Sequence, residues 1–549
     1  MNKSIILIIF ILSVENLFSQ ICKNTYFIEF KDKGENTQLI STPEKFLSKR
    51  AIERRLRYNI PININDIPVY QNYVLEIQKL GFKILLKSKW FNGITVYTED
   101  SVLIESAKSL PFVKEIPLFV SVKKEKIDSL QLLKYQNVIE KNVHRQEVKN
   151  KYEYGKSLSQ IELNNGNYLH NLGYCGQNML IAVTDVGFVK ADELSAFKTM
   201  FKEKRFVGAY NFVNNTDSVF KDGSHGTSCL SIICADVKDQ LIGSAPKANF
   251  ALLVSETGKY ELPIEEFNWI SAVEFADSIG ADVISTSLGY FSYDDSTYNR
   301  LYTDLDGKTA LASRAASIAA QKGIIVCVAA GNSGASKKPW ISIPSDADSI
   351  LTVAAVTKDK KTAYFTSIGF TSDNRVKPDV AAVGFLTIYQ STNGKFVQGN
   401  GTSLATPIIA GLTACLWQKY PSKTNSEIMD AIRQSADCCN NPNIYTGYGI
   451  ADFEKADQIL KTQLPSFIKI IHSSDNTKTS TVIFSKNNIQ FSYQVVNSKN
   501  KVVLKSKKFT TSSELSKFEI NLNKKTPDNY TIKLFINGEE YCFSYSTLL

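Results

Sequence analysis

Glycine and proline are scarce in this chain of 549 residues, with 28 and 15 copies. Such usage, with 43% hydrophobic residues, excludes a collagen-like or disordered protein. The nine cysteines are too sparse for a disulfide scaffold, and their odd number leaves at least one thiol without a partner in the chain. No His and Cys residues have the spacing of a zinc site, and no internal repeat or low-complexity tract is present.

Positive charge in excess is confined to the N-terminal part. Residues 21–160 carry 24 Lys and Arg against 16 Asp and Glu, a net charge of +8, whereas residues 161–549 carry 38 against 37. Binding of nucleic acid depends on a concentrated positive field that releases counterions. The nearly neutral bulk of the chain therefore argues against a nucleic-acid partner.

The first 19 residues have the pattern of a secretory signal peptide. Lys3 precedes an apolar run from Ile5 to Leu12, and Glu15 and Asn16 stop it well short of the roughly 20 apolar residues of a membrane span. No other stretch reaches that length. We expect an exported protein, secreted or at the cell surface, with no transmembrane span.

Residues 20–120 predict a small basic α+β unit. Residues 25–30 are strand-like, residues 43–57 have helical spacing, and alternating segments follow near 94–97 and 112–120. Residues 121–160 are polar, rich in Lys and Gln and weakly periodic. That composition is typical of a linker exposed to proteolysis.

In residues 161–462, apolar runs of strand length alternate with helical patterns. The runs lie at 179–183, 250–254, 283–285, 324–329 and 350–353, and the helical patterns include 265–279 and 309–322. This alternation predicts an α/β fold, a doubly wound and mostly parallel sheet with helices on both faces. Ligands of such sheets gather at the carboxyl ends of the strands. Residues 465–549 hold seven strand-like runs without helical patterns, which predicts a C-terminal β-sandwich.

Three segments of the α/β region place reactive side chains at the ends of elements. Thr184-Asp185-Val186-Gly187 ends a strand, His225-Gly226-Thr227 opens a helix, and Gly401-Thr402-Ser403 opens another. A serine hydroxyl becomes a strong nucleophile when an imidazole accepts its proton and a carboxylate orients that imidazole. Each residue also has a structural explanation: Asp185 as a turn residue, His225 as a polar group at a helix start, and Ser403 as an N-cap.

Taken together and in this order, the motifs resemble those of the subtilisin-like serine proteases, the subtilase family, over about residues 161–460. The most specific is Gly401-Thr402-Ser403-Leu404-Ala405-Thr406-Pro407. The resemblance implies a subtilisin-like fold and a serine endopeptidase with Asp185, His225 and Ser403 as its triad. Val328-Ala-Ala330-Gly331-Asn332-Ser333-Gly334 is similar to the oxyanion-hole segment, with Asn332 and the Ser403 N–H as donors.

The resemblance also implies the substrate and the flanking units. Ile284 to Gly289 is similar to the family's substrate-binding strand, so Ser287, Leu288 and Gly289 are expected to pair with the backbone of a protein or peptide substrate. Residues 20–120 suit a prodomain, the intramolecular inhibitor of a zymogen. The C-terminal unit resembles a sorting domain of the type IX secretion system, although its end, Tyr545-Ser-Thr-Leu-Leu549, lacks the usual lysine. An accessory β-sandwich is the alternative.

No cofactor is required for this chemistry. Calcium often stabilises family members, and Asp304-Leu-Asp306-Gly307 is similar to part of a calcium loop, but its twelfth position is Ala315 instead of an acid. We therefore name no metal ligands: the resemblance allows a structural calcium ion, but the sequence does not locate its site.

Two other functions fit the same residues. One is a catalytically inactive exported protein that binds peptides on a subtilisin-like scaffold, against which the intact Asp185, His225, Ser403 and Asn332 argue. The other is a cysteine peptidase using Cys229, which follows His225 by one helical turn but has no activating partner of its own. The absence of a Gly-x-Ser-x-Gly elbow excludes lipase-type hydrolases.

Overall fold

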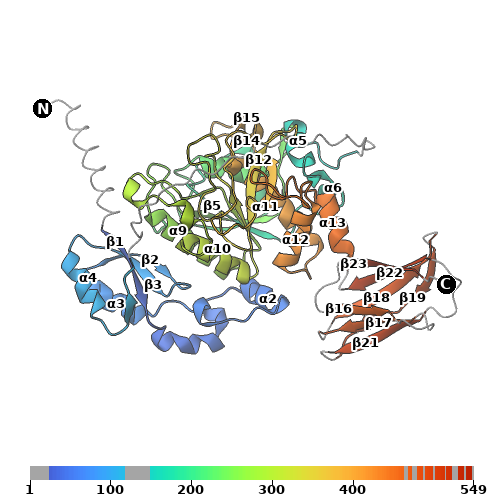
Figure 1. The fold of residues 1–549 in the computed structure, drawn as a ribbon, viewed down its shortest axis with the longest axis horizontal. Coiled ribbons are helices and arrows are strands. Elements are labelled where there is room, and N and C mark those ends of the chain that lie inside the picture. The colour runs from blue at the N-terminus through green and yellow to red at the C-terminus, as the bar shows by residue number, and fades with distance from the viewer. Residues whose placement is uncertain are drawn as a thin grey trace.

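The computed structural model describes residues 24–117 and 149–462 and, in the C-terminal part, 468–472, 479–485, 489–498, 501–512, 515–521, 529–536 and 539–546 (Figure 1). The predicted signal peptide and most of the predicted processing region lie outside these residues. Within them, no helix is both long enough and apolar enough to cross a bilayer.

A seven-stranded sheet forms the centre of the molecule (Figure 1). Every pair of neighbouring strands in it runs parallel. The sheet confirms the predicted fold class, and it adds two strands, β6 and β13, at its edges. Its order is β13 (Val380–Val383), β12 (Leu351–Val356), β11 (Ile325–Ala329), β10 (Val283–Thr286), β5 (Leu180–Asp185), β9 (Asn249–Val254) and β6 (Phe206–Asn211).

Helices cover both faces of this sheet because successive side chains of each strand point to opposite sides. On β5, Leu180 and Ala182 pack in one core with α9 (Ile264–Ile279) and α10 (Leu311–Gln321). Ile181 and Val183 pack in the other core with α8 (His225–Cys234) and α11 (Thr402–Lys419). With both faces buried, the strands are continuously apolar.

Smaller elements complete the central unit. The helices are α5 (Leu158–Glu162), α6 (Gly166–Asn171), α7 (Lys198–Lys202), α12 (Asn425–Ser435) and α13 (Phe453–Thr462). The strands form two antiparallel pairs, β7 (Asp236–Val237) with β8 (Leu241–Ile242) and β14 (Thr387–Gln390) with β15 (Phe396–Gly399). Short 3-10 turns lie at Gly155–Ser157, Ser195–Phe197, Ser296–Tyr298 and Tyr302–Asp304.

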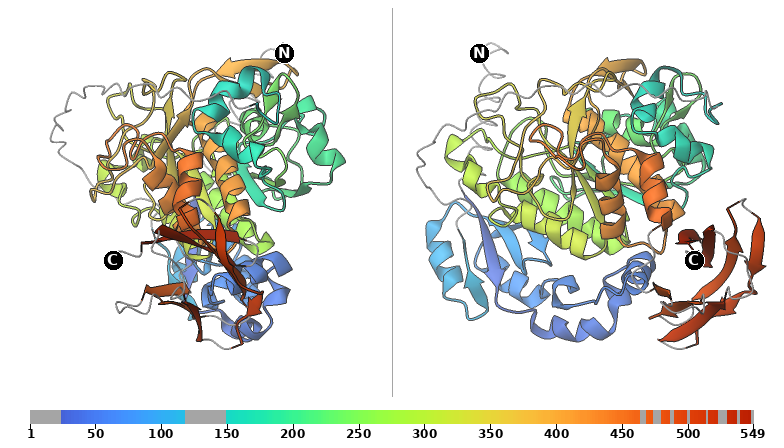
Figure 2. Two further views of the ribbon diagram at one scale, coloured as in Figure 1. Left: turned by 90° about the vertical axis from the view of Figure 1, so that its right-hand side faces the viewer. Right: turned by 45° about the vertical axis from the view of Figure 1, so that its right-hand side comes forward.

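The N-terminal unit is an antiparallel sheet with three helices. Its strand order is β2 (Lys83–Ser88), β3 (Gly93–Tyr97), β1 (Thr25–Phe30) and β4 (Val113–Glu115), and its helices are α2 (Lys49–Arg57), α3 (Gln71–Lys79) and α4 (Ser101–Lys108). Three 3-10 turns lie at Gly34–Ser41, Pro43–Lys45 and Ile64–Asp66. The helical pattern of residues 43–57 is split, because Ser48 caps α2 by accepting the Ala51 N–H at 3.1 Å. This unit lies against α9 and α10, shown in blue beside green in Figure 2.

The C-terminal part consists of strands in two antiparallel sheets around their own core. One has the order β16 (Ile468–His472), β17 (Thr479–Phe484), β21 (Ser516–Asn521). The other has the order β19 (Val502–Lys505), β18 (Gln490–Val496), β22 (Asn529–Ile536), β23 (Glu539–Ser546), with β20 (Phe509–Thr510) also on β18. β23 lies next to α13 (Figure 1), and the hydroxyls of Tyr541 and Ser422 share a hydrogen bond of 2.8 Å.

Candidate functional site

Asp185 and His225 form a hydrogen-bonded pair where β5 ends and α8 begins. Asp185 is fully buried, and its Oδ1 lies 2.9 Å from His225 Nδ1. The same oxygen accepts the Val186 N–H at 2.8 Å, and Oδ2 has no hydrogen-bond partner in the described part of the chain. The Asp185 charge raises the pKa of His225 well above its usual range. A proton held on Nδ1 leaves Nε2 free to accept another.

Close packing of the backbone makes this pairing feasible. A Cβ at Gly226, the second residue of α8, would lie 2.4 Å from the Gly187 oxygen and 2.8 Å from Asp185 Cβ. The His-Gly-Thr motif thus requires glycine because α8 starts directly against the end of β5. His225 remains partly exposed, so one side of the imidazole faces outward.

Ser403 is the second residue of α11 and is buried. The N-cap of this helix is Gly401, and no side chain caps it, so the simple N-cap explanation for Ser403 is wrong. A Cβ at Gly401 would lie 2.7 Å from Ser403 Oγ. Glycine there keeps the space beside the hydroxyl open. Among the described residues, no hydrogen bond joins Ser403 Oγ to His225.

The Ser403 carbonyl connects three elements. Pro407 has no N–H, so this carbonyl lacks its usual partner four residues along the helix. Ser287 Oγ, just after β10, donates to it at 2.9 Å, and Cys229 Sγ on α8 donates at 3.3 Å. These bonds bring α8, β10 and α11 together at one point. Asp185, His225 and Ser403 therefore lie in the same region of the molecule.

Cys229 belongs to this junction as a neutral thiol. It is fully buried, and its Sγ lies 3.8 Å from His225 Nδ1 and 4.0 Å from Nε2. Burial raises the pKa of the Cys229 thiol. A buried thiol that donates to a carbonyl is a poor nucleophile, since the thiolate is the reactive form.

Asn332 is oriented by the residue before the serine. Its Oδ1 accepts the Thr402 N–H at 2.9 Å and the Thr402 hydroxyl at 3.1 Å. An N–H must face an oxygen, so these bonds fix the amide with Nδ2 on the other side. Nδ2 and the first amides of α11, which have no carbonyl partner within the helix, are donors available to a negative oxygen. The sequence did not indicate the role of Thr402, although it lies inside the Gly-Thr-Ser motif.

The predicted substrate-binding residues follow the carboxyl end of β10. Ser287 is turned inward toward Ser403 and Leu288 is buried, while Gly289 is exposed. In the described part of the chain, the backbone groups of Leu288 and Gly289 make no hydrogen bond. A Cβ at Gly289 would lie 2.0 Å from Ser342 Oγ. The segment after β10 thus has backbone groups that can pair with an added strand. Ser342 fills the space beside Gly289, where a side chain would otherwise lie.

A buried carboxyl supports the neighbouring loop, which sequence reasoning missed. Glu265 of α9 accepts the Thr257 N–H at 3.0 Å and the Leu262 N–H at 2.9 Å, and so fixes the segment after β9. Gly258 in this segment packs close to Val186, the residue after Asp185. Burial raises the pKa of Glu265 to about 7 and that of nearby Glu256 well above its usual range.

Potential metal ligands are few in the residues that the structure describes. Asp185, His225 and Cys229 are the one group of three with donor atoms within 4.8 Å of one another. Hydrogen bonds already engage Asp185 Oδ1, His225 Nδ1 and the Cys229 thiol. The acids of the calcium-like loop serve local turns, since Asp304 accepts the Leu301 N–H and Asp306 those of Lys308 and Thr309. Whether a structural calcium ion binds elsewhere stays a prediction from the family resemblance.

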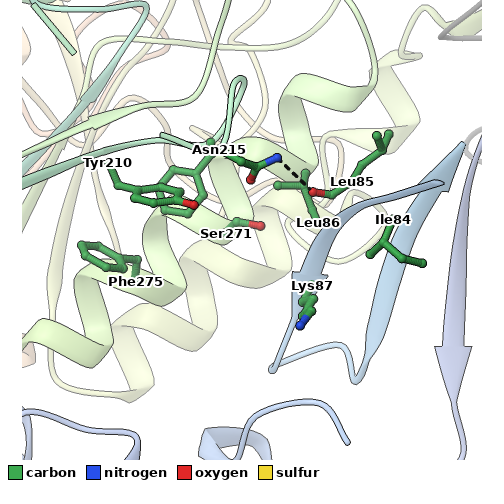
Figure 3. A pocket seen from close by; sticks show the side chains of 9 residues that line it. Ile84, Leu85, Leu86, Lys87, Tyr210, Asn215, Ser271 and Phe275 are labelled. Atoms are coloured by element: carbon green, nitrogen blue, oxygen red, sulfur yellow. Dashed lines mark hydrogen bonds between the residues drawn. The ribbon is translucent and has the colours of Figure 1, made fainter. Parts of the chain in front are cut away.

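A separate pocket lies between the N-terminal unit and the central unit (Figure 3). Leu85 and Leu86 of β2 line one side, and Tyr210, Phe212 and Phe275 the other. Asn215 Nδ2 donates to the Leu85 oxygen across it at 3.4 Å. The pocket contains none of the predicted site residues.

Comparisons with known proteins match two parts of the chain to family models. A family model described as the subtilase family matches residues 176–458, and one described as the peptidase S8 propeptide domain of Bacteroidota matches residues 25–137. Subtilisin NAT of Bacillus subtilis subsp. natto is 30% identical over 317 residues, 56% of this chain and 73% of the relative. Subtilisin DY of Bacillus licheniformis is 31% identical over 293 residues, covering 52% and 93%.

More distant relatives include serine protease AprX of Bacillus subtilis, 29% identical over 314 residues, with 51% and 66% covered. The solved structure of the prenylagaramide maturation protease PagA is 20% identical, with a TM-score of 0.42 over 54% of this chain and 98% of that one. With a family model covering more than half of its length, this chain belongs to the subtilases, a family of serine endopeptidases, and carries an N-terminal propeptide domain of that family.

Proposed function

We propose that this protein is a secreted serine endopeptidase, made as a self-processing zymogen, in which Asp185, His225 and Ser403 form the catalytic triad. The observation that carries this proposal is the 2.9 Å bond from Asp185 to His225 Nδ1, in a region that the Ser403 carbonyl joins through Cys229 and Ser287. Protein or peptide substrates follow from the open backbone of Leu288 and Gly289.

The reaction would proceed by acyl transfer. Ser403 Oγ attacks the peptide carbonyl while His225 Nε2 takes its proton, and Asp185 stabilises the imidazolium. His225 then gives the proton to the leaving amine, and water opens the acyl-enzyme by the same route. Asn332 Nδ2 and the Ser403 N–H hold the oxyanion. Loss of one such donor costs about 3 kcal/mol of transition-state stabilisation, a magnitude that comes from subtilisin.

Maturation would separate the propeptide domain from the mature enzyme. The final residues of the predicted processing region, 121–160, are folded into the central unit: Tyr154, Ser157 and Gln160 are buried. We therefore place the cut before residue 150. The propeptide is then the enzyme's intramolecular inhibitor, and residues 1–19 direct export. The C-terminal strands serve as an accessory unit or as a signal for type IX secretion.

Labelling with a fluorophosphonate probe tests the enzyme class. The purified protein is expected to carry the label on Ser403, and Ser403→Ala to carry none. A protein that binds peptides without hydrolysis would stay unlabelled. Inhibition by a thiol reagent without any fluorophosphonate label would instead favour a cysteine nucleophile at Cys229.

A further inference from the structure

A cluster of buried charges joins propeptide helix α2 to the far end of α9. Asp277 of α9 is fully buried, and Arg54 Nη2 donates to its Oδ1 at 2.6 Å. Arg55 Nη2 donates to both carboxylate oxygens, at 2.7 and 2.9 Å, and Lys89 Nζ to Oδ2 at 3.1 Å. The two guanidinium groups are almost completely buried as well. Three propeptide cations thus converge on one carboxylate of the mature enzyme.

Backbone carbonyls at the C-terminal ends of α9 and α10 also accept hydrogen bonds from the propeptide arginines. Arg54 also donates to the carbonyls of Ala281 and, at 3.2 Å, of Lys322, which follow α9 and α10. Neighbouring Arg50 donates to the Gly280 oxygen at 2.9 Å and pairs with Asp282. The carbonyls at a helix C-terminus carry partial negative charge, which favours cations there. The C-terminal ends of α9 and α10 therefore form a site suited to arginine.

A second carboxylate closes the cluster from the propeptide side. Asp66 is fully buried, lies 3.0 Å from Arg55 Nη2 and accepts from Lys322 Nζ at 2.9 Å. Lys322 belongs to the mature enzyme and also donates to Asn63 at 3.2 Å. The propeptide and the mature enzyme therefore each contribute both a cation and an anion. Separating the two units breaks ion pairs in which each unit supplies either charge.

This cluster lies near the N-terminal end of β5, whereas the candidate catalytic residues lie near its carboxyl end. Arg50 donates to Asn178, just before β5 begins, whereas Asp185 is the last residue of β5. Six strand residues at about 3.3 Å each separate the two ends by roughly 17–20 Å. The described contacts of the cluster thus include none with Asp185, His225 or Ser403.

The rest of the interface combines polar contacts with an unfilled pocket. Glu274 of α9 accepts the Ser88 hydroxyl at 2.5 Å and the backbone N–H groups of Lys89 and Trp90 at 2.8 and 3.1 Å. Beyond it, the edge strand β2 leaves the pocket of Figure 3, where the two units do not fill the space between them. The densest network of polar contacts is therefore the one around Asp277.

We propose that Asp277 and the ends of α9 and α10 form a propeptide-retention site on the mature enzyme, which recognises the paired guanidinium groups of Arg54 and Arg55. The site holds the propeptide in place after the connecting chain has been cut. Removing one partner of a buried charge group is strongly unfavourable because the other is left uncompensated. Lysine cannot replace either arginine, since it lacks the planar fork with which Arg54 bonds a carboxylate and carbonyls, and Arg55 the carboxylates of Asp277 and Asp66. The proposal rests on the zymogen function above.

The test uses the full chain with Ser403→Ala and a recognition sequence for a site-specific protease inserted between residues 121 and 148. Cutting then depends on the added protease alone, so the result does not depend on self-processing. After the cut, the rate at which the propeptide leaves a C-terminally tagged mature part is measured. We expect Arg54→Met with Arg55→Met, and separately Asp277→Asn, to speed its release about 100-fold.

Lys49→Met is the matched control, because Lys49 lies on the same helix with 91% of its side chain exposed. Its release rate is expected to equal that of the parent, and Arg55→Lys is expected to release nearly as fast as Arg55→Met. The double arginine variant leaves every residue of the mature enzyme unchanged, so it remains informative if Asp277→Asn fails to fold. Equal release from the double variant and from Lys49→Met would overturn the proposal.

Discussion

The Nδ1 atom of His225 lies 2.9 Å from Oδ1 of Asp185, a carboxylate buried at the end of a central strand. The negative charge favours the protonated imidazole and raises the pKa of His225. A general base must be neutral to accept the serine proton. Activity is therefore expected to increase with pH as His225 loses its proton, with a midpoint above the usual histidine value of about 6.5.

Asp185→Asn tests this electrostatic coupling. Without the carboxylate charge the pKa of His225 falls, so the rising limb of kcat/KM against pH is expected to move to lower pH. The maximal rate falls about 10⁴-fold because the imidazole is no longer held in the productive tautomer. A pH–rate profile of both proteins measures the two effects, and an unchanged midpoint would contradict the role of Asp185.

Ser403→Ala is expected to leave the precursor intact during expression. Self-processing needs the hydroxyl, and the substitution removes only that group, so α11 is expected to keep its fold. Mass spectrometry of the purified chain reports the N-terminus. Maturation at the parent's rate, in a preparation free of other proteases, would show that another enzyme makes the cut.

Asn332→Ala removes one proposed oxyanion donor. We expect kcat to fall about 10²–10³-fold with KM little changed, since the donor acts on charge that develops in the transition state. The melting temperature is also expected to fall, because Asn332 Oδ1 accepts the N–H and the hydroxyl of buried Thr402, and both lose this partner. Steady-state kinetics on a peptide substrate, with Ser333→Ala as a neighbouring control, separate the two readouts. A change confined to KM would argue for a substrate-binding role instead.

Cys229→Ala distinguishes the serine from the cysteine mechanism. The thiol donates to the Ser403 carbonyl, which keeps a second donor in Ser287. We expect fluorophosphonate labelling and most of the activity to persist, with a stability cost of about 1 kcal/mol for one lost hydrogen bond. Loss of all activity in Cys229→Ala, with no label on Ser403 in the parent protein, would assign the chemistry to the thiol.

Glu265 gives stability a pH dependence of known sign. Its pKa is raised to about 7 in the folded protein, against about 4.3 for a solvated Glu, so folding favours the protonated acid. The contribution is complete below the unfolded value and is lost as the pH rises through 7. Melting temperatures of the Ser403→Ala protein are expected to decrease between pH 5 and 8, and Glu265→Gln to flatten that slope. An unchanged slope would exclude Glu265 as its source.

The sequence predicts the alternating sheet and helices well because strand length and apolar runs are local signals. Two strands of the sheet escape prediction: β6 contains Gly208 and lies at the edge, and β13 has only four residues, two of them alanine. Neither has the continuous apolar run of an inner strand. Their places in the sheet come from pairing with distant strands.

The candidate site shows the same division between local and distant information. Asp185, His225 and Ser403 are each surrounded by a local motif, so the sequence identifies them. The bond from Thr402 to Asn332 spans 70 residues, and that from Arg55 to Asp277 spans 222. Arginines in a strongly charged helix predict a solvated surface, and their burial follows from a carboxylate that no nearby sequence indicates.

Pro407 interrupts the amide ladder of α11 one turn beyond the nucleophile, and the freed carbonyl becomes a shared anchor for a hydroxyl and a thiol from two other elements. The missing hydrogen bond in α11 thereby makes the position of Ser403 depend on the positions of α8 and β10. Small displacements of α8 or β10 would be transmitted to the nucleophile through a single oxygen atom.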